Sequence, residues 1–314
     1  MIATLQSLRF VFVMLIFLSH FDYRDIQALD AGGDCGVAFF FLLSGFVLSM
    51  GYGRQITDGT FCYGRFLKRR FLKLYPLHLL CLLFFLIVSK QHLDGAVFLN
   101  VLLLQAWIPS PDYYFSCNSV SWFLSCLFFC YILFPFAYKR VSGRWLTLVL
   151  VAYLLVYLLT PYEKVNAILY VHPLVRFVDF YLGMFLCQVF ERRKETDIPQ
   201  WTELLMVVLL LVSLGLYPYV DAKLRNAPLY WLVLIPLIFV FAQEKGYISQ
   251  WLKTKPMLFL GSLSMPLFLT HQMLIGILLR RTPEIPAPVM LAFCIFITLM
   301  VSWGVHIIFS RLLR

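Results

Sequence analysis

Long apolar segments recur along the whole chain, and short polar loops separate them. About ten of these segments approach or reach the length of a transmembrane helix, which is roughly 17 to 25 residues. The predicted spans cover residues 5–21, 36–52, 71–89, 119–138, 145–160, 172–190, 203–219, 229–243, 257–279 and 287–309. The pattern therefore predicts an all-α, polytopic integral membrane protein with about 10 transmembrane helices.

One apolar segment, GAVFLNVLLLQAW at residues 95–107, does not fit this alternation. A full crossing there would move the basic stretch KRVSGR at residues 139–144 to the outer side and invert every later loop. We therefore expect a re-entrant or partial span at 95–107, with an eleventh crossing as the alternative. Backbone that enters the membrane without crossing must pack within protein or line a cavity, so this segment is a candidate cavity wall.

Composition points to the same class of protein. Hydrophobic residues make up 61% of the chain and charged residues only 13%, whereas soluble domains carry roughly 25% charged residues. A soluble globular protein of this size would have too few charged residues to solvate its surface. No internal repeat, low-complexity tract or separate soluble segment is visible, so residues 1–314 are predicted to form a single domain.

Basic residues are unevenly distributed among the loops. Clusters at residues 65–73, 139–144 and 192–193 fall on the side of the predicted bundle that also carries both termini. Cytoplasmic loops carry such an excess of lysine and arginine, so both termini are expected to be cytoplasmic. The net charge of +10 then follows from membrane topology, and no nucleic-acid partner is expected.

The first span contains two groups that are costly in a membrane. LRFVFVMLIFLSH at residues 8–20 is almost entirely apolar, yet it carries Arg9 and His20. Eleven helical steps of about 100° come to within roughly 20° of three full turns, so both side chains share one face, about 16 Å apart. A charge at the bilayer centre costs at least roughly 2.5 to 3.5 kcal/mol. Taken alone, each group is also explained by a position at the membrane–water interface. Their common face favours a functional role.

Other predicted spans also hold polar groups. Arg176 and Asp179 lie three residues apart and are adjacent on one helix face, where they form either a structural ion pair or a device that orients a catalytic group or a substrate hydroxyl. His271 is either a hydrogen-bonded core histidine or part of a site, and Ser121 is a further polar candidate. The predicted topology puts His20, Arg176, Asp179 and His271 in the outer half of the membrane, where we expect one shared cavity.

The basic run RFLKRRFLKLYP at residues 65–76 opens the third predicted span. As a topological signal it needs no further function. A second interpretation is phosphate capture, because arginine binds phosphate oxygens in pairs and lysine adds a point charge. The candidate phosphate ligands are Arg65, Lys68, Arg69, Arg70 and Lys73.

Taken in order, six segments resemble the acyltransferase 3 family of membrane-bound O-acyltransferases, which modify bacterial surface polysaccharides and other sugars. The resemblance covers nearly the whole chain and includes the first-helix pattern of arginine, ten residues and histidine. The segments are LRFVFVMLIFLSH at 8–20, GVAFFFLLSGFVLS at 36–49, RFLKRRFLKLYP at 65–76, SWFLSCLFFCYILFP at 121–135, HPLVRFVDFYLGM at 172–184 and LGSLSMPLFLTHQ at 260–272.

The resemblance implies transfer of an acyl group, usually acetyl, from cytoplasmic acyl-CoA to a hydroxyl of a surface polysaccharide or lipid-linked sugar at a bacterial inner membrane. Arg69, Arg70 and Lys73, with Arg65, would bind the CoA phosphates, and Arg9 would steady the pantetheine arm or polarise the thioester. His20 would act as general base on the acceptor. Acceptor-side support would come from the pair Arg176 and Asp179, the pocket residues His271 and Ser121, and the stacking face of Trp122. Acetyl-CoA is expected as a substrate, with no permanently bound cofactor and, since the eight cysteines lack ligand spacing, no metal.

One position departs from the family pattern. Many members carry a glutamate where this chain has Leu127, so roles of that glutamate do not transfer. A transporter or flippase of a glycan or small solute is the alternative from another class, because secondary carriers also contain many spans and buried charges. An inactive relative that serves as an assembly partner is a third. The sequence contains no indication of oligomeric state.

Overall fold

The structure is a computed structural model that describes residues 2–23, 26–27, 30–90, 92–193, 198–226, 228–281 and 285–312. Its α-helices are α1 (Ala3–Ser19), α2 (Gly32–Thr57), α3 (Tyr63–Ser89), α4 (Gly95–Val101), α5 (Pro111–Tyr114), α6 (Trp122–Tyr138), α7 (Gly143–Leu159), α8 (Pro173–Arg193), α9 (Thr202–Gly215), α10 (Ala222–Arg225), α11 (Pro228–Ala242), α12 (Tyr247–Leu252), α13 (Lys255–Ser262), α14 (Ser264–Arg281) and α15 (Ala287–Leu312). Single turns η1 (Gln105–Trp107), η2 (Ser119–Ser121), η3 (Tyr162–Lys164), η4 (Asn166–Tyr170) and η5 (Tyr217–Tyr219) join them. The strands β1 (Asp22–Tyr23) and β2 (Ile26–Gln27) form one short antiparallel pair.

The all-α class predicted from the sequence is confirmed, and each predicted span overlaps a helix. The count of about ten crossings is not confirmed. Among the described residues, six helices are long and apolar enough to cross a membrane, and a seventh is added if α13 and α14, bent by 58° at their junction, form one span. Helices α1, α7 and α9 are apolar but shorter. The chain is an integral membrane protein. Its hydrophobic pattern predicted the positions of the helices more accurately than their lengths.

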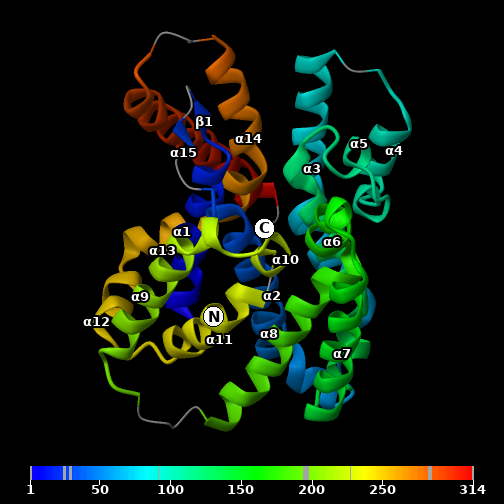
Figure 1. Cartoon of the computed structure of the whole chain (residues 1–314), viewed down its shortest axis with the longest axis vertical. Coiled ribbons are helices and arrows are strands. Elements are labelled where there is room, and N and C mark those ends of the chain that lie inside the picture. Colours follow the sequence, from blue (N-terminus) through cyan, green and yellow to red (C-terminus); the bar gives the residue numbers. More distant parts are fainter. Residues whose placement is uncertain are drawn as a thin grey trace.

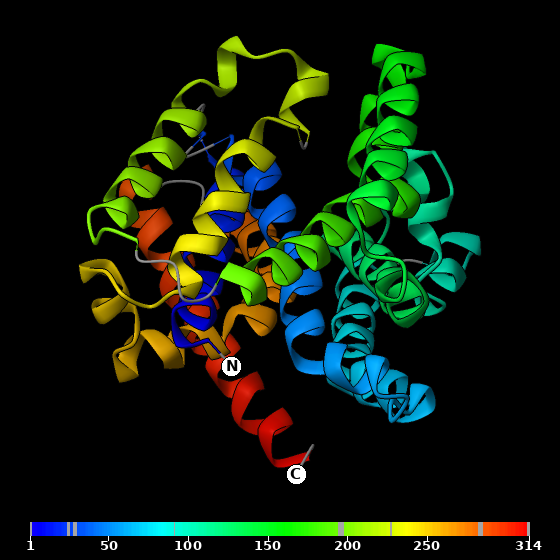
Figure 2. The same cartoon turned by 90° about the horizontal axis from the view of Figure 1, so that it is seen from below.

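Helices α1, α2 and α8 lie at the centre of the molecule. Figures 1 and 2 show α3, α6 and α7 on one side of α2 and the segment α9 to α13 on the other. Glycines allow the close packing of the central helices: a Cβ at Gly45 would lie 1.9 Å from the carbonyl oxygen of Phe180, and one at Gly183 would lie 1.9 Å from that of Leu42. Small residues bring helix backbones into contact in membranes, so α2 and α8 form a rigid support for the site.

The segment at 95–107 does not cross. Helix α4 has 7 residues and is therefore about 10 Å long, against a hydrocarbon core of about 30 Å. Leu103 then takes a left-handed conformation with φ of 56°. Side chains of neighbouring helices bind carbonyl groups at the end of α4. His78 contacts the carbonyl oxygen of Asn100 at 2.9 Å, and Ser125 donates a hydrogen bond to the carbonyl oxygen of Leu103 at 2.6 Å. The eleventh crossing is excluded by length, and the segment is packed within protein.

Candidate active site

Helix α1 presents its two predicted functional groups to two different cavities. The first has a volume of about 270 Å³ and is lined by Arg9 together with Arg70 and Lys73 from α3. The second, also about 270 Å³, contains His20, which caps the C-terminal end of α1. Helix α1 and the residue that follows it therefore reach both cavities, whereas the spacing of eleven residues indicated only that the two side chains share one face.

The first cavity is strongly cationic. No carboxylate is among its lining residues, and Nε of Arg9 is buried without a hydrogen-bond partner in the described part of the chain. Arg70 lies against the aromatic rings of Tyr52 and Tyr131, and its Nη2 donates to the Tyr52 hydroxyl at 3.2 Å. Three cations without a nearby carboxylate repel one another, so this arrangement favours an anionic ligand.

Only part of the basic run reaches this cavity. Arg70 and Lys73 line it, whereas Arg65, Lys68 and Arg69 do not. The helical period does not explain this division, because Arg69 lies four residues before Lys73 and shares its face. The packing around α3 decides which of these side chains reach the cavity. Leu127, the position at which many family members carry a glutamate, also lines the cavity. The departure noted in the sequence thus removes a carboxylate from the surroundings of Arg9.

The second cavity contains His20, Trp122, Tyr170 and Gln272. Trp122 is where the sequence analysis expected a stacking face. Tyr170 and Gln272 were missed: Gln272 directly follows His271, while Tyr170 lies in the irregular turn η4, which has no hydrophobic period to mark it. Tyr170 therefore became a candidate only once the chain was folded.

His271 contacts His20 directly. Nε2 of His271 lies 3.3 Å from Nδ1 of His20. Nδ1 of His271 lies 2.8 Å from the carbonyl oxygen of Phe268, and Nδ1 of His20 lies 2.8 Å from that of Ile16. A carbonyl oxygen can accept a hydrogen bond but cannot donate one, so both Nδ1 atoms are N–H groups. His271 Nε2 therefore accepts a hydrogen bond from His20 Nδ1. This tautomer leaves the lone pair of His20 on Nε2, which has no hydrogen-bond partner in the described residues.

An aromatic wall separates the two cavities. Phe268 lines both, and its ring centroid lies 5.0 Å from that of Phe123 and 6.4 Å from that of Phe40. Phe40 and Phe123 in turn lie 6.3 Å apart. The outcome is two chambers that meet at a ring rather than one open passage.

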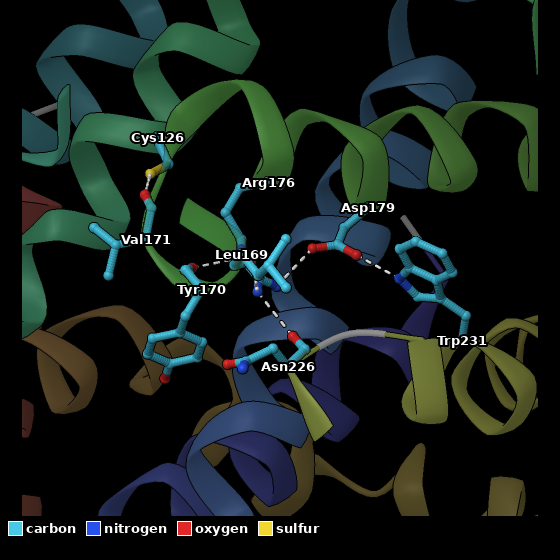
Figure 3. A network of polar contacts seen from close by, with 8 residues as sticks. All are labelled: Cys126, Leu169, Tyr170, Val171, Arg176, Asp179, Asn226 and Trp231. Carbon is cyan, nitrogen blue, oxygen red and sulfur yellow. Dashed lines mark hydrogen bonds and ion pairs between the residues drawn. The ribbon is translucent and has the colours of Figure 1, made fainter. Parts of the chain in front are cut away.

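Arg176 and Asp179 do not contact His20. Arg176 Nη1 bonds Asp179 Oδ2 at 2.8 Å, and both side chains are almost completely buried. The remaining guanidinium donors bind the carbonyl oxygens of Tyr170 at 2.6 Å, Leu169 at 2.7 Å and Asn226 at 2.8 Å, as Figure 3 shows. The predicted single cavity for these groups with His20 is not formed. The pair instead holds the turn that carries Tyr170. Of the residues in this network, only Tyr170 lines the His20 cavity.

Replacing Asp179 with asparagine is expected to lower the free energy of unfolding by about 3 to 5 kcal/mol, because the buried Arg176 charge loses its counterion. Thermal melting of the purified protein in detergent measures the effect. Asp58→Asn is the matched control: its partner Arg54 is 95% exposed, and such surface pairs contribute about 0 to 1 kcal/mol. Equal melting of the two variants would contradict a structural role for the buried pair.

Ser121 belongs to the supporting structure. It is fully buried, accepts a hydrogen bond from Gln105 Nε2 at 3.1 Å and donates to Asn100 Oδ1 at 3.0 Å. Both partners come from the segment 95–107, so Ser121 anchors that segment to α6. It does not line the His20 cavity.

Similar known proteins indicate the family of this chain. A family model described as an acyltransferase domain, Acyl_transf_3, matches residues 2–307. Acyltransferase MdmB of Streptomyces mycarofaciens is 32% identical over 157 residues, 44% of this chain, and protein 2 in the picA locus of Rhizobium radiobacter is 42% identical over 71 residues, 22% of this chain. The chain spans 39% and 37% of the lengths of these relatives. No solved structure matches. Because the family model covers nearly the whole chain, the protein belongs to the acyltransferase 3 family.

Proposed function

We propose that the protein moves an acyl group, acetyl in the simplest case, from cytoplasmic acyl-CoA to a hydroxyl of a surface polysaccharide or lipid-linked sugar. The proposal is carried by the arrangement around α1. Arg9 lines a cationic cavity, His20 lines a second cavity, and the ring of Phe268 borders both. A donor and an acceptor thus have separate chambers that meet at one point. The proposed setting is a bacterial inner membrane with both termini cytoplasmic.

The donor chamber suits CoA. Its phosphates would lie near Arg70 and Lys73, in the first half of α3, and its thioester near Arg9. Ser264, the first residue of α14, lines the same cavity, and a helix N-terminus carries a partial positive charge that also favours anions. The exposed Arg65 and Arg69 would attract the donor from solution rather than hold it.

The acceptor chamber supplies the base. His20 Nε2 takes the proton of the acceptor hydroxyl while that oxygen attacks the thioester carbonyl, and the C–S bond breaks as the new C–O bond forms. The imidazolium then returns the proton to the CoA thiolate, so the products are the ester and free CoA. The Nδ1 proton, held between Ile16 and His271, stays in place throughout. For the carbonyl to reach His20, the ring of Phe268 must turn aside.

His271 is a positioning residue in this scheme. His271→Leu is expected to lower kcat by about 10- to 100-fold, since His20 loses the acceptor that orients it. His271→Gln, whose side-chain oxygen accepts a hydrogen bond, should recover part of the lost kcat. Equal activity of the two variants would show that His271 acts only in packing.

Purified protein incubated with acetyl-CoA labelled in the acetyl group tests the proposed function. We expect label to move to an added glycan acceptor or, slowly, to water, and both reactions to need His20. If label never leaves CoA while reconstituted vesicles take up a free solute, the carrier alternative is correct and the enzymatic proposal is overturned.

A further inference from the structure

A third hollow lies beside the His20 cavity, between two membrane helices. It has a volume of about 350 Å³ and is lined by Phe84 and Val88 of α3, by Gly276 and Ile277 of α14, and by the connector at 115–119. Figure 1 shows α3 and α14 rising toward the same end of the molecule. We call this hollow the lateral groove. Its helix-borne walls are largely apolar.

The lateral groove adjoins the His20 cavity. Phe115, Ser119 and Gln272 line both, and the Ser119 hydroxyl donates a hydrogen bond to Gln272 Oε1 across the junction. A molecule in the groove therefore has a polar boundary at its inner end, and directly beyond that boundary lies His20.

The groove also contains an unsatisfied polar atom. Asn118 is 1% exposed and lines the groove. Its Nδ2 donates to the carbonyl oxygen of Leu269 at 2.9 Å, which fixes the orientation of the amide, and Oδ1 is left buried without a partner in the described structure. A buried acceptor without a donor is unfavourable, and a ligand hydroxyl would satisfy it. Burial and the Asp94 carboxylate raise the pKa of the neighbouring Cys117 thiol to about 11, so that thiol is an inert part of the wall.

We propose that the lateral groove admits the acceptor from the bilayer, and that the acceptor is an amphiphilic alcohol: an apolar body lies between α3 and α14, one hydroxyl donates to Asn118 Oδ1, and another reaches His20. The inference rests on the proposed function and names the class of acceptor for that site. A purely water-soluble sugar would make no use of the apolar walls, because such walls bind a ligand by burying its apolar surface.

Gly276 provides a direct test. A Cβ added there meets no atom within 4 Å, and Gly276 lines the groove, so the side chain of Gly276→Phe begins in open space and places a ring in the groove. Gly304 on α15 also has open space at its Cβ and does not line the groove, so Gly304→Phe is the matched control. Each protein, in lipid nanodiscs with acetyl-CoA, is titrated with decyl β-D-glucoside and with methyl β-D-glucoside, which share one sugar and differ in the alkyl chain. The measurement is the concentration at which each glycoside half-maximally changes acetyl-CoA consumption, either upward as an acceptor or downward as a competitor.

For the wild type and Gly304→Phe, we expect the decyl glycoside to act at a concentration at least about tenfold lower than the methyl glycoside. Gly276→Phe should shrink this advantage by at least about tenfold, because several methylene contacts are lost, while its slow hydrolysis of acetyl-CoA, which depends on His20, persists and shows that it is folded. An unchanged advantage in Gly276→Phe, an equal loss in both variants, or no effect of either glycoside on the wild type overturns the lateral groove. Absence of acetyl-CoA consumption in the wild type would contradict the proposed function itself, and this inference with it.

Discussion

His20→Ala is expected to lower acyl transfer by at least about 100-fold and as much as about 10⁴-fold, the range that positioned acid and base groups contribute. His20 lies after the last residue of α1, with its Nδ1 bonded to the carbonyl oxygen of Ile16, and it lines the proposed acceptor chamber. Removing the imidazole takes away the proton acceptor but leaves the helix hydrogen bonds intact. The measurement is release of free CoA together with formation of the ester.

The folding control for this result is thermal melting of the same preparation, which should change by only a few degrees. His306→Ala is the matched variant, since His306 lies on α15 and lines none of the three cavities described here. It should retain full activity. If His20→Ala transfers at the wild-type rate while binding CoA normally, the role of His20 as base is wrong.

Arg9→Met is expected to raise the KM for acetyl-CoA by at least about tenfold and, in the same protein without ligand, to raise thermal stability. The buried Nε of Arg9 has no partner in the described residues, and two further cations share its cavity. Replacing a half-buried charge that has no carboxylate beside it with an apolar side chain of similar length relieves desolvation and repulsion between cations, so ligand-free Arg9→Met should melt at a higher temperature than the wild type. A residue retained at a cost in stability is typical of a functional site.

Arg69→Met is the control for this experiment. Arg69 lies on the exposed face of α3 and outside the cavity, so its loss should change KM only slightly and stability very little. Melting curves with and without CoA separate binding from folding: CoA should stabilise the wild type and Arg69→Met far more than Arg9→Met. Lower stability of ligand-free Arg9→Met would show that the guanidinium serves the fold rather than the donor.

The helical period predicted some relationships well. Arg9 and His20 were assigned to one face from their spacing alone, and the structure brings each to the edge of its own cavity. The same period, applied along α3, does not explain the basic run: Arg69 and Lys73 are four residues apart and share one face, yet Lys73 lines the Arg9 cavity and Arg69 does not. A period specifies which residues lie together on a helix, but not what that face will meet.

Contacts between helices were beyond the reach of such patterns. Arg176 and Asp179 were correctly paired as neighbours three residues apart, yet their partners, the carbonyl groups of Tyr170 and Asn226, come from an irregular turn and from a distant loop. His271 and His20 lie 251 residues apart in the chain and 3.3 Å apart in space. Neither contact follows from local periodicity, because both depend on how α1, α8 and α14 pack.

The sequence by itself determined that this is an all-helical membrane protein with costly polar groups on particular helix faces, since hydrocarbon thickness and the 3.6-residue turn act on every segment independently of its neighbours. Only the tertiary structure decided that the Arg9 and His20 cavities are separate, that Phe268 divides them, and that Ser121 and Arg176 support the site from outside. Those outcomes depend on side chains from helices far apart in the chain competing for the same space, and close packing admits one arrangement.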